Sequence, residues 1–285
     1  MRIVVTGGGG QLGTELKLLN CDSIDKKVFT HHELDITNAN KVDYYFKHNQ
    51  CDVIVNCAAY TSVDESESNK IKAFDINEKG VKNLVKACEK YKIRIIHYST
   101  DYVFGEDKNI NEFSEDDPLA PLNVYGKSKK KGEEVIMYSS IESIIIRTSW
   151  LYSKYGKNFV KTMLELASED KEIKVVDDQF GNPTYAKDLA VATIEILNTE
   201  YYKWNKGGDV FHYSNEGECS WYEFAREIFR ISNKKIKIKK VSSREFKTLA
   251  KRPQRSCLSK SKIKEKFNIR IPKWEDSLRK MLIEK

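Results

Sequence analysis

The chain has 285 residues, 40% of them hydrophobic and five of them prolines, which is typical of a globular protein and excludes a disordered one. Its length suffices for one large α/β domain with a smaller lobe, or for two modest domains. The longest apolar runs, 93–96 and 144–146, are too short to span a bilayer, and the first residues show no signal-peptide pattern. We therefore expect a cytoplasmic protein with no membrane partner.

The net charge of +7 is unevenly distributed. Residues 201–285 hold 23 basic and 10 acidic residues, whereas residues 1–200 hold 26 basic and 32 acidic residues. A basic C-terminal part suits an anionic partner, either a phosphorylated small molecule or a nucleic acid, but composition alone favours a lysine-rich solvated surface. The six cysteines form neither a CxxC pair nor a Cys/His metal spacing, so we expect buried free thiols in a reducing compartment.

Strand and helix patterns alternate along the first 150 residues. The hydrophobic periodicity predicts strands at 2–6, 27–30, 52–59, 93–99 and 143–148, and helices at 14–19, 41–47, 69–91 and 125–138. This rhythm predicts βαβ units, and therefore an α/β fold of the Rossmann type, with a doubly wound parallel sheet between helices.

After Trp150 the rhythm loosens. Helices are predicted at 157–167, 186–197, 221–229 and 274–283, and strands at 173–176 and 235–241. No linker or repeat separates a second unit. We expect a dinucleotide-binding domain at 1–150, to which 184–200 returns, and a smaller, interwoven α/β substrate lobe at 151–183 and 201–285.

A glycine-rich loop, TGGGGQLG at 6–13, lies between the first predicted strand and the first predicted helix. Gly7 permits a tight turn, Gly10 lets the backbone approach a pyrophosphate, and Gly13 lets the helix pack closely on the strand. The free N–H groups of the helix N-terminus then face the anion. The loop therefore predicts a dinucleotide site.

The acidic residue that usually ends the second strand of such a site is missing, because that position falls near Thr30. No arginine replaces it, so the residues leave the choice between NADH and NADPH open. Asp35 and Ile36 could hold the adenine, although Asp35 could equally belong to a helix N-cap. Small residues at 58–61 end a buried strand, where a cofactor ribose could lie close to the backbone.

Three residues are candidates for catalysis: Thr100, Tyr125 and Lys129. Tyr125 and Lys129 are four residues apart in YGKSK, so on a helix they share one face. A free tyrosine titrates near ~10, and bringing it to about 7 requires ~4 kcal/mol of preferential stabilisation of the phenolate. We expect the Lys129 ammonium and an oxidised nicotinamide to supply it. Thr100, or Ser99 beside it, could hydrogen-bond a substrate carbonyl.

These motifs together resemble the extended short-chain dehydrogenase/reductases, through TGxxGxxG, HYSTDYVF (97–104) and NVYGKSK (123–129). Three further strings, RTSWLY (147–152), DDQFGNPT (177–184) and RPxxSxL from Arg252, resemble the dTDP-4-dehydrorhamnose reductase family. The resemblance implies NAD(P)H-dependent reduction of the C4 keto group of dTDP-4-dehydro-β-L-rhamnose to dTDP-β-L-rhamnose, the last step of dTDP-rhamnose biosynthesis. That product is a precursor of surface polysaccharides.

The resemblance also implies residue roles. Tyr125 is the proton donor, Lys129 tunes it and holds the nicotinamide ribose, and Thr100 acts on the sugar with Asp101. Trp150 packs on the substrate, and Arg252 is our choice for the contact with its diphosphate, since a guanidinium matches phosphate oxygens. The cofactor-lining residues that it implies are Gly10, Gln11, Leu12, Asp35, Ile36, Ala59, Tyr60, Thr61 and Tyr98, beside Gly7 and Gly13 of the loop.

Some questions stay open at this point. Family members with an acidic residue at the position of Thr30 exist, so cofactor preference is not carried over. Some members dimerise through magnesium held by glutamates. Glu15 alone is expected to be a surface residue, so we expect no metal. The oligomeric state is expected to be a monomer or a homodimer. The rival interpretations are another sugar-nucleotide epimerase or reductase, a non-catalytic regulatory subunit of this fold and, least favoured, nucleic-acid binding; the intact Tyr125–Lys129 pair opposes the regulatory subunit.

Overall fold

A computed structural model describes residues 1–107, 110–167, 172–200 and 202–283. Six parallel strands form the central sheet in the order β10-β5-β4-β3-β1-β2. The predicted Rossmann-type sheet is therefore confirmed. Its strands are β1 (Arg2–Thr6), β2 (Asp25–Phe29), β3 (Val53–Asn56), β4 (Arg94–Thr100), β5 (Ser143–Thr148) and β10 (Asp209–His212).

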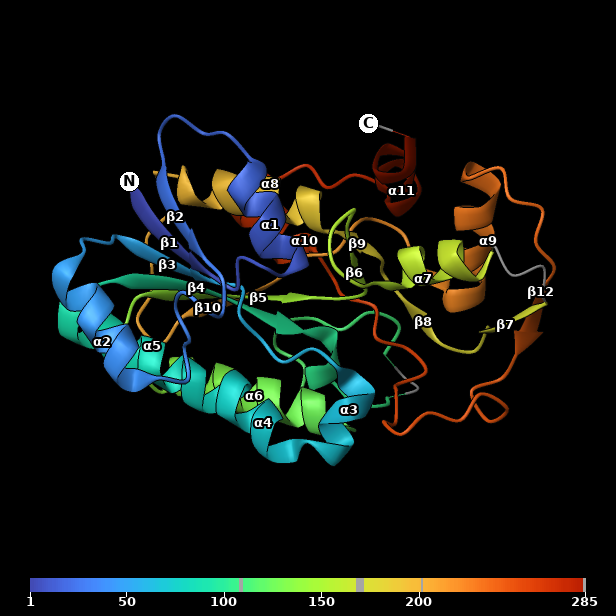
Figure 1. The fold of residues 1–285 in the computed structure, drawn as a ribbon, viewed down its shortest axis with the longest axis horizontal. Helices are drawn as coiled ribbons and strands as arrows, with labels where there is room; N and C mark the ends of the chain where they lie inside the picture. The colour runs from blue at the N-terminus through green and yellow to red at the C-terminus, as the bar shows by residue number, and fades with distance from the viewer. Residues whose placement is uncertain (108–109, 168–171, 201, 284–285) are drawn as a thin grey trace.

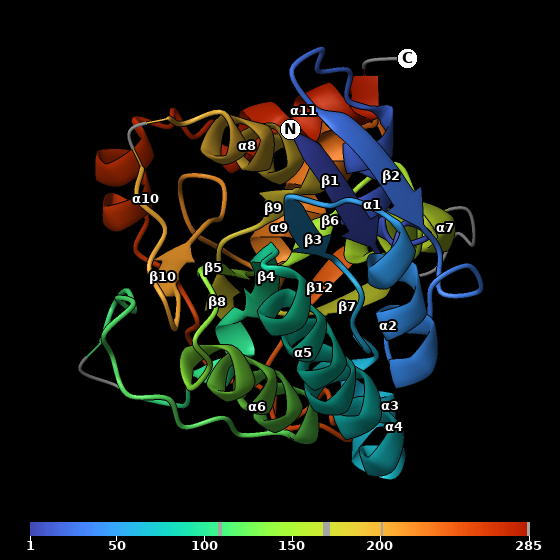
Figure 2. The same cartoon turned by 90° about the vertical axis from the view of Figure 1, so that its left-hand side faces the viewer.

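Helices cover both faces of this sheet, as Figures 1 and 2 show. One face packs against α1 (Gln11–Leu18), α8 (Ala186–Leu197) and α10 (Ser261–Phe267). The other face packs against α2 (Ala39–His48), α5 (Val81–Tyr91) and α6 (Val124–Met137). Strand order reverses between β1 and β3, and ligands of doubly wound sheets bind at such a switch point, beyond the carboxyl ends of the strands.

The second lobe lies beyond the carboxyl end of the sheet and has its own apolar core, to the right in Figure 1. The aromatic side chains of Tyr152, Phe224 and Trp274 are buried in this core. The lobe joins α7 (Phe159–Leu166), α9 (Trp221–Ile231) and α11 (Trp274–Ile283) to the strands β7 (Ile173–Val176) and β12 (Ile238–Val241), which pair in parallel. Short two-residue strands connect the lobe to the sheet: β6 (Leu151–Tyr152), β8 (Phe180–Gly181), β9 (Thr184–Tyr185) and β11 (Cys219–Ser220).

Residues 201–285 do not all belong to this lobe. β10 adds a sixth strand to the central sheet by pairing with β5, and α10 packs on the same face as α1. This placement differs from the predicted extent of the substrate lobe, because an apolar strand of four residues gives no sign in the sequence of the sheet that it joins. The predicted lobe boundaries at 201 and 285 fall outside the described residues.

The helix predicted at 69–91 is divided into three parts. α4 (Lys70–Phe74) follows α3 (Val63–Ser68), and a π-helical segment, η1 (Asp75–Gly80), joins α4 to α5. Within this segment Asn77 accepts from the backbone N–H of Tyr60 at 2.8 Å and donates to its carbonyl at 3.0 Å. The widened turn therefore anchors the loop that follows β3.

Candidate active site

A cavity of about 660 Å³ opens at the carboxyl ends of β1, β3, β4 and β5. Its walls come from the glycine loop, from α6 and from the second lobe, so it lies where the two parts of the chain meet. The predicted site residues that line it are Gly10, Gln11, Leu12, Gly13, Ala59, Thr61, Tyr98, Thr100, Asp101, Tyr125, Lys129, Trp150 and Arg252.

The glycine loop has the geometry of an anion cradle. Gly7 has a φ of +71°, and a Cβ there would lie 2.5 Å from the backbone nitrogen of Ala58. Gly10 precedes α1 in an extended conformation, and no side chain caps the N-terminus of that helix. Its free N–H groups are therefore open to a diphosphate at the mouth of the cavity, so the loop fits a dinucleotide.

Tyr125 and Lys129 lie on one face of α6, where Lys129 is buried and Tyr125 is half-buried. Asn123 caps this helix by accepting from the backbone N–H of Gly126 at 2.8 Å, which fixes the turn that carries Tyr125. The side chain of Lys129 is 2% exposed, and its Nζ donates to the carbonyl of Tyr98 at 2.5 Å. Both side chains thus converge on the end of β4.

Burial controls the protonation of both groups. It raises the pKa of Tyr125 to about 12, although a hydrogen bond from Thr100 lowers it, and nearby Asp101 adds to the rise. Burial also lowers the pKa of Lys129 to about 8, against the opposing effect of Glu133. Desolvation is thus the largest influence on the pKa of the Tyr125 phenol in the protein alone. The expectation that the Lys129 ammonium and an oxidised nicotinamide together lower this pKa stays a prediction. Tyr125 is a protonated phenol at neutral pH.

Thr100 and Asp101 follow Tyr98 and Ser99 at the end of β4. The Thr100 hydroxyl donates to Asp101 Oδ1 at 3.0 Å and accepts from the backbone N–H of Tyr102 at 3.2 Å. The side chain of Asp101 is 2% exposed. The buried carboxyl, the hydroxyl and the phenol of Tyr125 therefore form one polar group at the floor of the cavity.

Trp150 has an unusual backbone, with a φ of +45°. Its ring stacks on that of Trp221, with the centroids 3.5 Å apart and the planes 8° apart. A Cβ at Gly181 would lie 2.6 Å from Cε2 of Trp150, so the ring is held closely on that side as well. Packing of the indole against Trp221 and Gly181 thus stabilises the strained backbone of Trp150.

Arg252 reaches the cavity from the loop before α10. Its guanidinium binds the carboxylate of Asp64 at 2.6 and 3.2 Å and also donates to the carbonyl of Ala250. Ala250 in turn donates its N–H to Asp64 at 3.0 Å. The loop of the second lobe is thereby fastened to α3, and Arg252 is positioned at the cavity wall.

Four predicted cofactor residues do not line the cavity. Gly7 lies beneath the loop, and the backbone of Tyr60 is bound to Asn77. Asp35 accepts from the backbone and hydroxyl of Thr37, at 2.9 and 2.8 Å, and Ile36 is buried. The N-cap of α2 is Asn38, not Asp35.

Sequence reasoning missed several cavity residues. Trp221 and Phe159 belong to helices of the second lobe whose apolar faces predicted only packing, yet both reach the cavity wall.

Sequence reasoning also missed an acidic group beside the end of β2. The carboxylate of Glu33 accepts hydrogen bonds from the backbone N–H and the hydroxyl of Thr30, at 2.8 and 2.7 Å. The signal was a glutamate three residues downstream, which a search at the strand end alone overlooks.

The expectation that Glu15 is a surface residue is wrong. Glu15 is buried and accepts from the Ser153 hydroxyl at 2.6 Å, so it joins α1 to the second lobe. Among the described residues no group of three His, Cys, Asp or Glu side chains is arranged to hold a metal ion. In the same part of the chain no helix is long and apolar enough to cross a membrane.

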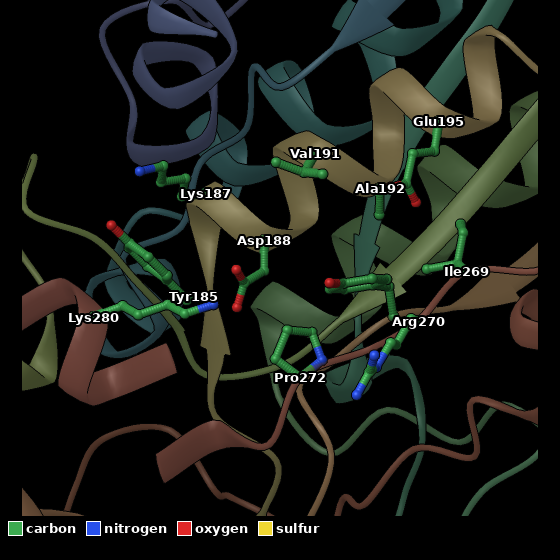
Figure 3. A pocket seen from close by; sticks show the side chains of 11 residues that line it. Tyr185, Lys187, Asp188, Val191, Ala192, Glu195, Ile269, Arg270, Pro272 and Lys280 are labelled. Carbon is green, nitrogen blue, oxygen red and sulfur yellow. The ribbon is translucent and has the colours of Figure 1, made fainter. Parts of the chain in front are cut away.

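A second cavity, of about 390 Å³, lies between α8 and the segment 269–272 (Figure 3). It contains none of the predicted site residues. Its central carboxylate, Asp188, is bonded to Asn215 at 2.8 Å and to the hydroxyl of Ser277. These bonds hold α11 against the start of α8, which is a structural role.

Comparison with known proteins places this geometry in context. The whole chain, residues 1–285, matches the family described as the RmlD substrate binding domain. It is 40% identical over 286 residues to a dTDP-4-dehydrorhamnose reductase of Aggregatibacter actinomycetemcomitans, which covers 98% of this chain and 97% of the relative. It is 42% identical over 287 residues to the spore coat polysaccharide biosynthesis protein SpsK of Bacillus subtilis, which covers 100% of this chain and 98% of the relative. A crystal structure of dTDP-4-dehydrorhamnose reductase from Bacillus anthracis in complex with NADP aligns with a TM-score of 0.93 and 39% identity, covering 100% of this chain and 99% of that one.

Proposed function

The chain belongs to the dTDP-4-dehydrorhamnose reductase family, and from this premise we propose how its own residues carry out the reaction. The protein is a nicotinamide-dependent oxidoreductase that reduces the C4 keto group of dTDP-4-dehydro-β-L-rhamnose to dTDP-β-L-rhamnose. The reduced nicotinamide of NADPH or NADH supplies the hydride when it is bound. The chain must supply the binding site, the orientation of the sugar and the proton.

The glycine loop is the part of the cavity that suits the cofactor. The uncapped N-terminus of α1, after Gly10, would hold the diphosphate, and Ala59 and Thr61 would lie along the nicotinamide half. Lys129 donates to the carbonyl of Tyr98, and its remaining N–H groups are available for the nicotinamide ribose. Asp35 and Ile36 stay predictions for the adenine end.

Tyr125 donates the proton to the carbonyl oxygen at C4. Burial keeps its phenol protonated at neutral pH, which is the state that a reduction requires of a proton donor. Thr100 lies between Tyr125 and Asp101. Its hydroxyl donates to Asp101 Oδ1 in the resting protein and would turn to donate to the phenolate as the negative charge forms there. The single observation that carries this assignment is the convergence of Tyr125, Lys129 and Thr100 in the cavity that the glycine loop also lines.

The second lobe supplies the contacts for the sugar nucleotide. The stacked Trp150 presents an apolar wall, and Arg252 presents a guanidinium that suits a diphosphate. A nucleotide-activated sugar is an intracellular metabolite, so we place the protein in the cytoplasm. The oligomeric state stays a prediction of a monomer or a homodimer.

The experiment that tests this function is a direct assay with dTDP-4-dehydrorhamnose and each reduced nicotinamide, followed by the loss of absorbance of the reduced cofactor. We expect measurable turnover with both, because Thr30 carries no charge of its own and no arginine stands beside it. A preference for NADH beyond about a thousandfold, or ~4 kcal/mol, would contradict tolerance of the 2′-phosphate. If neither cofactor supports turnover, the assignment is wrong.

A further inference from the structure

A lysine of the second lobe, Lys157, lines the same cavity as the glycine loop. It shares the cavity wall with Gly9, Gly10 and Gln11, and it is exposed there. Among the described residues, its ammonium has no hydrogen-bond or ion-pair partner. It is therefore an uncommitted cation in a cavity that must receive two anions, the dinucleotide and the sugar nucleotide.

The two chain neighbours of Lys157 both contact Gln11, the first residue of α1. Asn158 donates from its side-chain amide to Gln11 Oε1 at 2.9 Å. Gly156 has a φ of +67°, and a Cβ there would lie 3.1 Å from Cγ of Gln11, so its backbone packs closely on that side chain. The backbone that carries Lys157 is thus held against the first turn of α1, whose N-terminus no side chain caps.

A second contact fixes the start of the same segment. The Ser153 hydroxyl donates to Glu15 on α1 at 2.6 Å and accepts from the backbone N–H of Tyr155 at 3.1 Å. Asn158 also donates to the carbonyl of Ser153 at 2.8 Å, which closes the segment into a compact loop. The backbone position of Lys157 relative to α1 is therefore defined at both ends, while its side chain stays free to reach a ligand.

The other two cations that line the cavity are committed. The ammonium of Lys129 donates to the carbonyl of Tyr98, and the guanidinium of Arg252 is paired with Asp64. Within the described part of the chain, Lys157 is thus the one cation of the cavity wall with no bond to the protein itself.

An ammonium at this place complements what the helix N-terminus provides. The free N–H groups of α1 carry only partial positive charge, whereas a diphosphate carries full negative charge. Hydrogen bonds between an ammonium and a phosphate are charge-assisted and stronger than neutral ones. A lysine suits this task, since its flexible stem and three donors adapt to phosphate oxygens without a fixed geometry.

We propose that Lys157 binds the diphosphate of the nicotinamide cofactor, so that the second lobe completes the anion site that the glycine loop begins. The bound cofactor is then held by both parts of the chain. This inference rests on the proposed function and adds a residue of the second lobe to its cofactor site.

The test measures the dissociation constants of NADPH and NADH from the change in nicotinamide fluorescence, with no sugar nucleotide present. We expect Lys157→Gln to raise both constants by about three- to tenfold, because the diphosphate is common to both cofactors. Lys157→Arg keeps the charge, so both constants stay within about twofold of the wild-type values.

Lys161→Gln is the matched control. Lys161 lies in the first turn of α7 and does not line the cavity, so its substitution removes the same charge from the same region without touching the site. We expect its dissociation constants to stay within about twofold of wild type. Added KCl weakens NADPH binding more steeply in the wild type and in this control than in Lys157→Gln, because salt screens the contact that the variant lacks. A merely structural role of Lys157 would leave that salt dependence unchanged.

The outcomes separate the inference from the proposed function. Equal affinities and equal salt dependence of wild type and Lys157→Gln would overturn the inference alone. It would also be overturned if only NADPH were affected, which would indicate the 2′-phosphate, or if only KM for the sugar nucleotide rose. Wild-type protein that binds neither nicotinamide would overturn the proposed function, and this inference with it.

Discussion

Tyr125 is the residue on which the proposed chemistry depends most. Its phenol must be protonated to act, and burial ensures this. We expect Tyr125→Phe to reduce kcat by about a hundredfold or more, the usual contribution of proton transfer, while NADPH binding stays close to wild type. Steady-state kinetics and a cofactor titration check this. Comparable turnover by a folded Phe variant would remove Tyr125 from the mechanism.

Arg252 tests whether the basic charge of residues 201–285 serves the substrate. If the guanidinium binds the diphosphate, Arg252→Ala raises KM for the sugar nucleotide by about tenfold or more, ~1.4 kcal/mol, with little change in KM for the cofactor. Arg230→Ala is the matched control, because Arg230 is also paired with a carboxylate, that of Glu227, but lies on α9 away from the cavity. Equal and small effects of the two substitutions would support a merely solvated surface.

Glu33 bears on cofactor preference. Its carboxylate holds the backbone of Thr30 directly after β2, and these hydrogen bonds keep the pKa of Glu33 low, so the group is ionised. A negative charge there repels a 2′-phosphate. We expect Glu33→Gln to raise the ratio of kcat/KM with NADPH to that with NADH by about three- to tenfold, whereas exposed Glu89→Gln leaves it unchanged. An unaltered ratio in Glu33→Gln would contradict this role.

At the scale of elements, β8 and the Trp150 stack form one unit. A Cβ at Gly181 has no room beside the indole, so we expect Gly181→Ala to displace Trp150 from Trp221. KM for the sugar nucleotide then rises about tenfold or more, while KM for NADPH is little changed, and the near-ultraviolet circular dichroism of the stacked pair weakens. Retention of that circular dichroism signal together with wild-type kinetics would show that the close packing of Trp150 on Gly181 is not needed for substrate binding.

The elements also show what the sequence could and could not predict. The strands at 143–148 and 173–176 and the helices at 186–197 and 274–283 match the structure residue for residue, because short apolar runs and amphipathic spacing are local properties. The π-helical segment at 75–80 was missed, since its apolar spacing does not differ from that of an α-helix and the bond between Asn77 and Tyr60 within it is non-local. The shared face of Tyr125 and Lys129 follows from their spacing alone. The packing of Trp150 instead depends on contacts with Gly181 and Trp221, which are distant in sequence.

At the scale of the whole molecule, the active site depends on how the two parts of the chain are joined. Gln11 donates to the carbonyl of Leu151 at 3.3 Å and accepts from Asn158 at 2.9 Å, so the glycine loop is tied directly to the second lobe. Arg252 and Asp64 form the corresponding tie on the other side of the cavity. Among the described residues of 201–285, Arg252 is the one basic residue that lines the cavity, so most of the positive charge of this part is solvated surface.

The central claim is the transfer of hydride to C4 of the sugar nucleotide with a proton from the protein. The most direct test incubates the protein with dTDP-4-dehydrorhamnose and NADPH that carries deuterium at the transferring position, and identifies the product by mass spectrometry and NMR. We predict dTDP-β-L-rhamnose with one deuterium at C4, formed by the wild type and, over the same short incubation, in an amount lower by about a hundredfold or more with Tyr125→Phe. Unlabelled product, deuterium at another carbon, or equal labelling by Tyr125→Phe would contradict the account.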